Sequence, residues 1–213
     1  MEGMSITAQG VIDTFLVLLI GIGPKLALVP YVGITASLDA GTKRRVHRTM
    51  LLTAGTAALL LILLGELLRV LLHFSVASLS IAGGIILLIQ AVVMVLAPPH
   101  MDDHGLAGRD PVQVARYPLA VPYLLNPVGI VGLVTISAEA TSVAVLAVAV
   151  GILLVVLVID ALVFRWADQV SARLDESRML ITEKVFGFLI AAIAVQLVID
   201  GVSAAAALAP AAH

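Results

Sequence analysis

Residues 18–30 read LLIGIGPKLALVP, with a proline and a lysine inside an otherwise apolar run. The apolar segment that surrounds this stretch contains only two charged residues, Asp13 and Lys25. A helix needs about 20 mostly apolar residues to cross a bilayer, because it rises ~1.5 Å per residue through a hydrocarbon core of ~30 Å. Proline inside such a helix removes a main-chain hydrogen bond and clashes with the preceding turn. The stretch therefore predicts a membrane-spanning segment that is interrupted at Gly23-Pro24.

The composition of the whole chain agrees with a membrane environment. Of its 213 residues, 61% are hydrophobic and 12% are charged, and the mean hydropathy is +1.14. Soluble domains are roughly 45–50% apolar and about 25% charged, so a soluble globular or disordered chain is excluded. A net charge of -2 gives no reason to expect nucleic acid as a partner. The absence of cysteine excludes disulfides, zinc–thiolate sites and thiol catalysis.

Six segments of the chain are apolar enough to span a membrane. Their continuous runs of Leu, Ile, Val and Ala favour helices over the alternating strands of a membrane barrel. We therefore predict an all-α polytopic membrane protein with six transmembrane helices. We expect the first segment to be retained, because the residues before it carry Glu2 and no Lys or Arg, unlike a signal peptide. The predicted spans are 8–36, 49–71, 75–97, 117–138, 142–164 and 184–206.

The basic residues indicate how the chain is oriented. Ten of the 12 Lys and Arg residues fall in the segments after the first, third and fifth spans. Basic loops remain on the cytoplasmic side of a membrane. We therefore predict a multi-pass protein of the plasma (inner) membrane with both termini outside the cytoplasm.

The spans divide evenly about the loop 98–116. Three spans on each side make the halves enter the membrane in opposite directions, which is a common plan among transporters. We predict two inverted three-helix repeats, 1–97 and 117–213, joined by 98–116 as a cytoplasmic linker. Asn126-Pro127 lies in the fourth span at a place corresponding to the interruption of the first, so helices 1 and 4 are both predicted to be broken.

Broken helices at membrane depth indicate a site for a polar solute. They are tolerated where they face protein or a water-filled cavity, and the N-terminus of a half-helix favours a carboxylate or phosphate. The alternative is a pair of simple proline kinks without a ligand. The predicted substrate-binding residues are Gly23, Pro24, Lys25, Asn126, Pro127, Val128, Gly129 and Gln196.

Lys25 is the most informative single residue of this set. A lysine at the centre of a spanning helix costs roughly 2.5–3.5 kcal/mol on insertion scales. Contact with an anionic group of the substrate would explain it. A structural ion pair with an acid such as Asp13 or Asp160, or a side chain that extends to the interface, would explain it equally well. Asp13 lies about 18 Å away along an intact helix, so a pair with that residue is not expected.

Other polar residues in the spans are interpreted as structural. Glu66 precedes Arg69 by three residues, which predicts a local ion pair on one helix face. Asp160 lies near the cytoplasmic end of its span, and its position favours a structural role over that of a coupling-proton carrier. Hydroxyl groups such as that of Ser137 are expected to bond across helices.

The loop 98–116 contains a cluster of metal-ligating residue types. His100 and His104 flank Asp102 and Asp103, but a loop rich in Gly and Pro does not hold ligands in fixed geometry. We interpret this cluster as a solvated loop. Because the sequence shows neither a metal-ligand motif nor a nucleophile–base set, we expect no metal site, no cofactor and no enzymatic activity.

Several stretches resemble the MarC family, which belongs to a wider superfamily that includes the lysine exporters. The similar stretches are SIAGGIIL at 80–87, YPLAVP at 117–122, GFL at 187–189 with VQLVIDG at 195–201, and the basic loop at 43–45. The resemblance implies six helices, the inner membrane and transport of small neutral amino acids such as glycine and alanine.

Two departures from the family pattern lie at the predicted site. Members usually read Asn-Pro in the first helix, where this chain has Gly23-Pro24-Lys25. Members usually read Gly-Pro-Gly in the fourth helix, where this chain has Asn126-Pro127 and then valine. The additional lysine indicates a substrate with more negative charge than those of typical members.

The leading functional hypothesis is a transporter or exporter of a small amino-acid-like metabolite that works by alternating access. A coupling proton or sodium ion and a homo-oligomer are compatible with it. One alternative is a translocase of a lipid-linked anion such as a polyprenyl phosphate. Another is a non-transporting membrane subunit of a larger complex.

Overall fold

The computed structural model describes residues 7–96, 109–171 and 176–208. In this part of the chain all regular structure is helical, apart from one isolated bridge between two residues. Four helices are long and apolar enough to cross a membrane, and they overlap the predicted spans at 49–71, 75–97, 142–164 and 184–206. They are α3 (Ala40–Leu71), α4 (Val76–Leu96), α8 (Val143–Ser171) and α9 (Glu176–Leu208).

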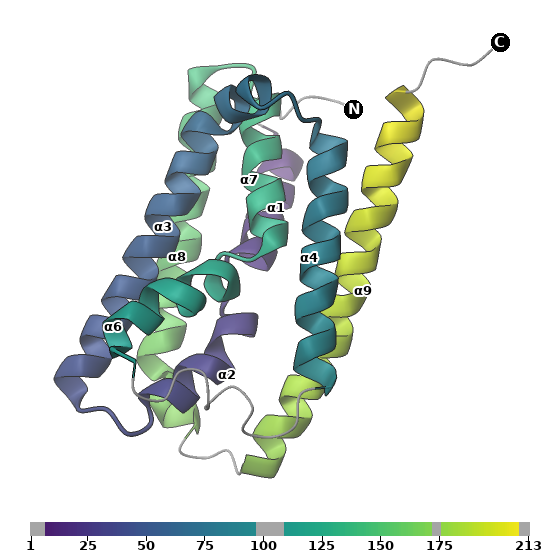
Figure 1. Ribbon diagram of the computed structural model, residues 1–213. Coiled ribbons are helices and arrows are strands. Elements are labelled where there is room, and N and C mark those ends of the chain that lie inside the picture. Colours follow the sequence, from purple (N-terminus) through teal and green to yellow (C-terminus); the bar gives the residue numbers. More distant parts are fainter. Residues whose placement is uncertain (1–6, 97–108, 172–175, 209–213) are drawn as a thin grey trace.

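The other two predicted spans, 8–36 and 117–138, are each divided into shorter helices. In the first, α1 (Ala8–Gly21) is followed by α2 (Pro24–Thr35). In the second, a short α6 (Pro111–Val114) leads into the kinked segment η1 (Ala115–Leu124), and α7 (Pro127–Glu139) follows. These divided segments lie between the pair α3–α8 on one side and the pair α4–α9 on the other (Figure 1).

Several helix ends differ from the predicted boundaries. The segment 165–183 lies between two predicted spans, but residues up to Ser171 continue α8 and residues from Glu176 already belong to α9. The main-chain hydrogen bonds of a helix continue past its apolar stretch, so hydropathy alone underestimates its length. Helix α6 begins inside the expected loop 98–116, where the side chain of Asp110 accepts a hydrogen bond from Val112 N–H. Residues 98–108 of that loop lie outside the described residues, and they include His100, Asp102, Asp103 and His104.

Large apolar side chains cover the outer surface of the long helices. Leu63 and Leu67 of α3 and Ile86 and Ile89 of α4 are each more than half exposed. In the most apolar stretch of each long helix, only 22% to 28% of residues are buried inside the protein. So much exposed hydrocarbon is unfavourable in water and favourable in lipid. The described chain therefore has the surface of an integral, multi-pass membrane protein.

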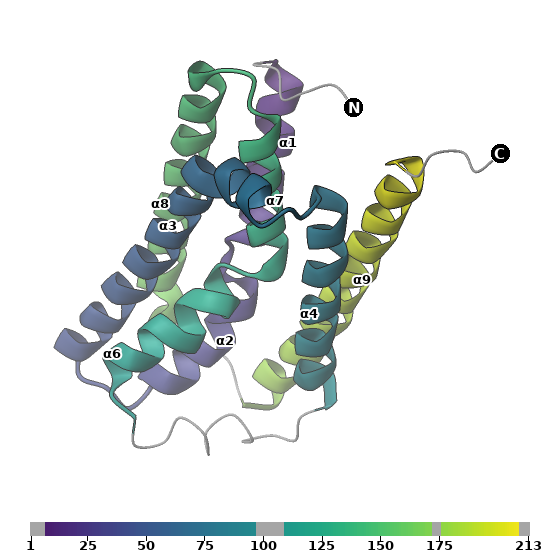
Figure 2. The ribbon, with the colours of Figure 1, turned by 45° about the horizontal axis from the view of Figure 1, so that its top comes forward.

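The two ends of the described chain lie at the same end of the molecule. Helix α1 begins and α9 ends there, while α2, α6 and α8 reach the opposite end (Figures 1 and 2). That opposite end carries the start of α3, with Lys43, Arg44 and Arg45. We call it the basic end.

Helices α4 and α9 pack closely through glycine. A Cβ atom added at Gly84 of α4 would stand 2.7 Å from the carbonyl oxygen of Ala194 and 3.0 Å from the amide nitrogen of Val198, both on α9. Small residues allow this kind of close approach between membrane helices.

We therefore predict that Gly84→Ala destabilises the protein by about 1–3 kcal/mol, because the added methyl group overlaps the backbone of α9. The matched control is Gly151→Ala in α8, where no atom lies within 4 Å of the added Cβ. That control should be neutral or stabilise the helix by roughly 0.5–1 kcal/mol. Unfolding of both variants in mild detergent tests the contact, and equal stabilities would contradict it.

Candidate functional site

The interruptions in both divided segments have the same local cause. Pro24 begins α2 and Pro127 begins α7, each at a position where a helix tolerates proline. The residue before a proline is disfavoured in the helical region and adopts extended backbone. Accordingly, Gly23 has φ -134° and ψ 159°, and Asn126 has φ -89° and ψ 170°. The Gly-Pro and Asn-Pro pairs therefore interrupt their segments where the sequence predicts breaks.

The two interruptions meet in space and pair through their main chains. Ile22 and Leu125 form an isolated antiparallel bridge, and both are almost completely buried. The main-chain N–H of Asn126 donates to the carbonyl oxygen of Gly21 at 3.0 Å. Main-chain groups freed by one break are thus partly satisfied by the other, as hydrocarbon depth requires.

The side chain of Asn126 joins two helix ends. Its Nδ2 atom donates to the carbonyl oxygen of Ile20 at 3.0 Å, and its Oδ1 atom accepts from the N–H of Gly129 at 3.2 Å. The backbones of α1 and α7 touch here, since a Cβ atom at Gly21 would stand 2.2 Å from Gly129 Cα. Asn126 therefore closes the C-terminus of α1 and caps the N-terminus of α7.

The N-terminus of α2 has no corresponding cap. Gly23 supplies no side chain, and a Cβ atom there would stand 2.3 Å from the carbonyl oxygen of Leu19. Lys25 follows in the first turn of α2, and its Cε atom lies 3.7 Å from where that Cβ would be. The lysine side chain therefore runs back along the break.

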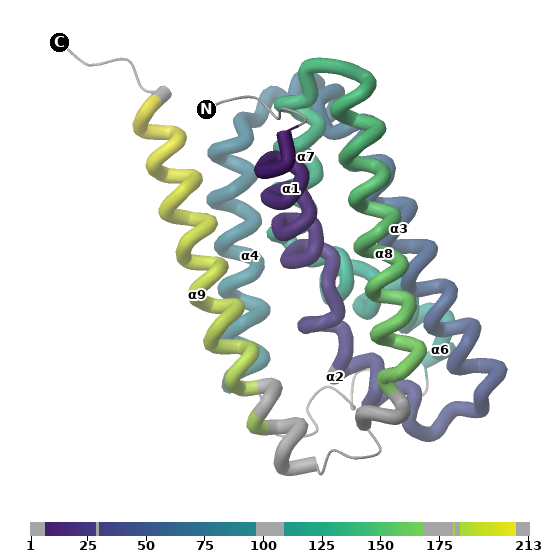
Figure 3. Tube along the Cα trace, turned by 180° about the vertical axis from the view of Figure 1, so that it is seen from behind, coloured from purple at the N-terminus to yellow at the C-terminus, as the bar shows by residue number. Residues whose placement is uncertain are grey.

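The charge of Lys25 is not balanced by an acid in the described part of the chain. No carboxylate there lies within 4.0 Å of its ammonium group, so the ion pair with Asp13 or Asp160 is not formed. The side chain is half-buried. Helix N-termini carry partial positive charge. The N-termini of α2 and α7 both lie at the breaks (Figure 3). The region is electropositive and suits an anionic group.

The other predicted site residues do not all lie at the breaks. Pro127 and Val128 lie in the first turn of α7, and a Cβ at Gly83 of α4 would stand 3.5 Å from the Pro127 carbonyl oxygen. Gln196 is exposed on α9, and its amide donates to Asp200 on the same helix at 2.7 Å. The structure therefore brings Gly23 to Lys25 and Asn126 to Gly129 together, and it does not bring Gln196 to them.

Two expected polar contacts are confirmed away from the breaks. Arg69 donates to both carboxylate oxygens of Glu66, at 2.6 and 2.7 Å. The hydroxyl oxygen of Ser137 on α7 accepts from the main-chain N–H of Glu66 on α3 at 2.9 Å. Thr135 differs from Ser137, since its hydroxyl donates within its own helix to Val131.

Asp160 and Gln90 are polar side chains of predicted spans, and their polar atoms are buried. The position of Asp160 near the end of its span favours a structural role. In the structure, however, Asp160 is fully buried, and within residues 7–96, 109–171 and 176–208 neither of its oxygen atoms has a hydrogen-bond partner. The amide nitrogen and oxygen of Gln90 on α4 are likewise buried without partners. Val156 and Phe164, one turn to either side of Asp160, lie on the same helix face, and both are buried.

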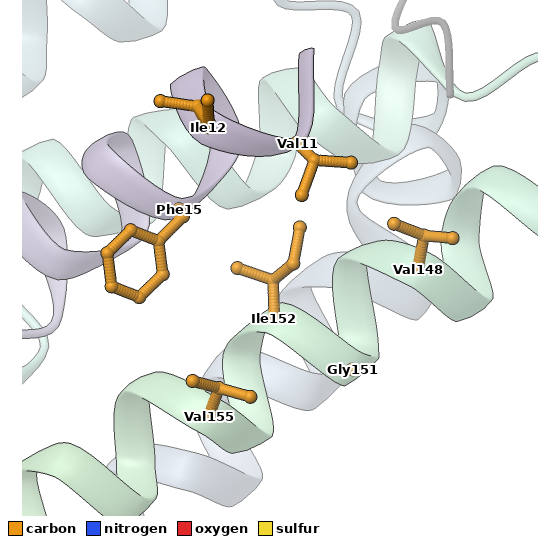
Figure 4. A pocket seen from close by; sticks show the side chains of 7 residues that line it. All are labelled: Val11, Ile12, Phe15, Val148, Gly151, Ile152 and Val155. Atoms are coloured by element: carbon orange, nitrogen blue, oxygen red, sulfur yellow. The ribbon is translucent and has the colours of Figure 1, made fainter. Parts of the chain in front are cut away.

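A groove of about 370 Å³ between α1 and α8 has a different character from the breaks. Val11, Ile12 and Phe15 line it from α1, and Val148, Ile152 and Val155 line it from α8 (Figure 4). No polar side chain contributes to its wall, so it offers a polar solute no hydrogen bond. It fits hydrocarbon, and it is not the place where an anion would bind.

The fold and the paired breaks define a class: an integral membrane protein of apolar helices with two interrupted segments at its centre. Residues 8–206 match the MarC family of integral membrane proteins, and the chain belongs to that family. The chain is also similar to UPF0056 membrane protein MJ1677 of Methanocaldococcus jannaschii, with 26% identity over 187 residues, which cover 86% of this chain and 91% of that protein. No solved structure matches the chain significantly.

We predict that Asn126→Ala destabilises the protein by about 1–3 kcal/mol, because buried partners at Ile20 and Gly129 lose their hydrogen bonds. Asn126→Asp should have an intermediate effect, since it keeps the acceptor for Gly129 N–H but cannot donate to Ile20 when ionised. Thr135→Val is the control, because that hydroxyl bonds only within its own helix. Unfolding in mild detergent measures all three, and an Asn126→Ala variant as stable as Thr135→Val would contradict the assigned contacts.

Proposed function

We propose that this protein is a transporter or exporter of a small amino-acid-like metabolite. The substrate carboxylate binds at the paired breaks, held by Lys25 and the N–H groups of the first turn of α2. The observation that carries the proposal concerns Lys25, which is half-buried and has no acid of the described residues within 4.0 Å. It lies beside a helix N-terminus that has no side-chain cap. Electropositive groups at membrane depth are costly, and an anionic substrate would balance them.

The pattern of helix packing supports two inverted repeats of one plan, 1–97 and 117–213. Matching Gly23-Pro24 with Asn126-Pro127 relates α1 to η1, α2 to α7, α3 to α8 and α4 to α9. The packing of α1 on α7 then corresponds to the packing of η1 on α2. The packing of α3 on η1 corresponds to the packing of α8 on α1. Likewise α3 on α7 matches α8 on α2, and α4 on α7 matches α9 on α2.

Movement of these halves against each other would expose the breaks alternately to the two sides, as in other carriers with inverted repeats. In this proposal the divided segments complete six crossings, and the basic end faces the cytoplasm. The termini then lie outside, in the plasma (inner) membrane. The chain acts as a carrier and not as an enzyme.

The experiment is transport by purified protein in liposomes. We predict uptake and efflux of radiolabelled amino acids from a panel containing glycine, alanine, serine and glutamate. Lys25→Ala should weaken transport about 10- to 100-fold, because a hydrogen bond to a charged group contributes roughly 1.5–3 kcal/mol. Lys25→Arg keeps the charge and should lose less.

Lys43→Ala is the matched control, since Lys43 lies near the start of α3 at the basic end. Transport by Lys25→Ala at the wild-type rate would overturn the role of that lysine. Vesicles that carry a polyprenyl phosphate test the lipid-linked alternative. Movement of that lipid without movement of any amino acid would replace the proposal, and movement of neither would favour the non-transporting subunit.

A further inference from the structure

Asp160 is an isolated carboxyl group inside a membrane-crossing helix. It is fully buried on α8, and neither of its oxygen atoms has a hydrogen-bond partner among the residues that the structure describes. An ionised carboxylate enclosed without a partner carries a very large desolvation cost, whereas the neutral acid carries a much smaller one. The enclosure therefore suits a carboxyl group that holds a proton.

The place of Asp160 follows from the ring contacts one turn away. The rings of Phe164 and Tyr31 are 5.0 Å apart between centroids, which fixes α8 against α2 at that level. Both helices run toward the basic end (Figure 3). One turn back on each helix therefore brings Asp160 level with Ala27, which is also fully buried. Asp160 thus lies at the level of the first turn of α2, the turn proposed to hold the substrate.

The other ionisable groups on helices that pack against α8 are distributed around this level. His47 of α3 and Tyr31 of α2 lie one turn nearer the basic end, where the ring of His47 is 6.2 Å from that of Phe164. Asp13 of α1 and Glu139 of α7 lie near the opposite end. Lys25 is in the first turn of α2. Glu66 and Arg69 pair with each other near one end of α3. Near the other end of α3 lie the basic residues Lys43, Arg44, Arg45 and Arg48.

We propose that Asp160 binds the proton that couples transport, and that proton and substrate cross the membrane in the same direction. The inference rests on the proposed carrier function. An ionised Asp160 at the level of the first turn of α2 would oppose the negative charge of the substrate carboxylate. The substrate therefore binds when Asp160 holds a proton. When the site opens to the other side, the O–H bond of the acid ionises, the proton passes to water and the substrate leaves.

The surroundings favour a proton over a metal cation. The described residues contain no group of three or more His, Asp or Glu side chains placed to hold a metal ion. On its own helix face, Asp160 is flanked by the apolar side chains of Val156 and Phe164. Hard cations take several oxygen ligands, and one carboxyl group among hydrocarbon side chains offers only two oxygen atoms.

The first test observes the proton directly and needs no substrate. Infrared spectra of wild type and Asp160→Asn are recorded in lipid bilayers at neutral pH. The wild type should show the C=O stretch of a neutral carboxylic acid that the isosteric variant lacks. Asp13→Asn, which changes an exposed acid on α1, should leave that band unchanged. Loss of an ionised carboxylate band in Asp160→Asn, with no change in the neutral band, would overturn the proposal.

The second test separates coupling from transport in liposomes with radiolabelled alanine. Wild type should exchange alanine at equal pH and accumulate it when a proton gradient is imposed. Asp160→Asn should keep the rate of exchange within about twofold of wild type. Its gradient-driven accumulation should fall about tenfold or more, because typical coupling free energies correspond to changes of this size. Wild-type accumulation by Asp160→Asn, or a requirement for sodium, would overturn proton coupling. Absence of alanine exchange by the wild type would count against the proposed function, and the infrared band would still decide whether Asp160 holds a proton.

Discussion

The structure depends on how main-chain polar groups are satisfied where two helices stop inside the hydrocarbon. Water cannot reach such groups in a bilayer, so each N–H and C=O must find a partner within the protein. Here the partner of one interruption is the other interruption. Ile22 pairs with Leu125, and Asn126 bonds to the last carbonyl groups of α1 through both its main chain and its side chain. Two isolated breaks would each be costly, and placing them together relieves both.

The polar side chains at membrane depth fall into two groups. Glu66, Arg69 and Ser137 have partners in other side chains or in a neighbouring helix, and they hold the fold together. Lys25 and Asp160 have no counter-ion in the described chain. The carboxyl group of Asp160 also has no hydrogen bond there. In the proposed carrier, Lys25 supplies a positive charge and Asp160 binds a proton. Lys25 belongs to the first turn of α2, and Asp160 lies at the level of that turn.

The sequence was sufficient for the features that depend on local rules. Continuous apolar runs predicted α3, α4, α8 and α9, and the steric demands of proline predicted the breaks at Gly23 and Asn126. Features that depend on the third dimension were out of reach. Helix α8 is apolar on all sides, so no hydrophobic face marked Asp160 as pointing inward. The hydrogen bond from the Asn126 side chain to the carbonyl oxygen of Ile20 joins residues 106 positions apart, and no local pattern encodes that contact.

The unequal capping of the two half-helices has a geometric consequence. An amide oxygen caps the N-terminus of α7, while the N-terminus of α2 has no side-chain cap. In the proposed carrier, the bound substrate therefore lies off the axis that would relate the two halves. It lies nearer to α2, which runs toward the basic end. A carrier whose two halves share one plan would therefore be asymmetric at its binding site.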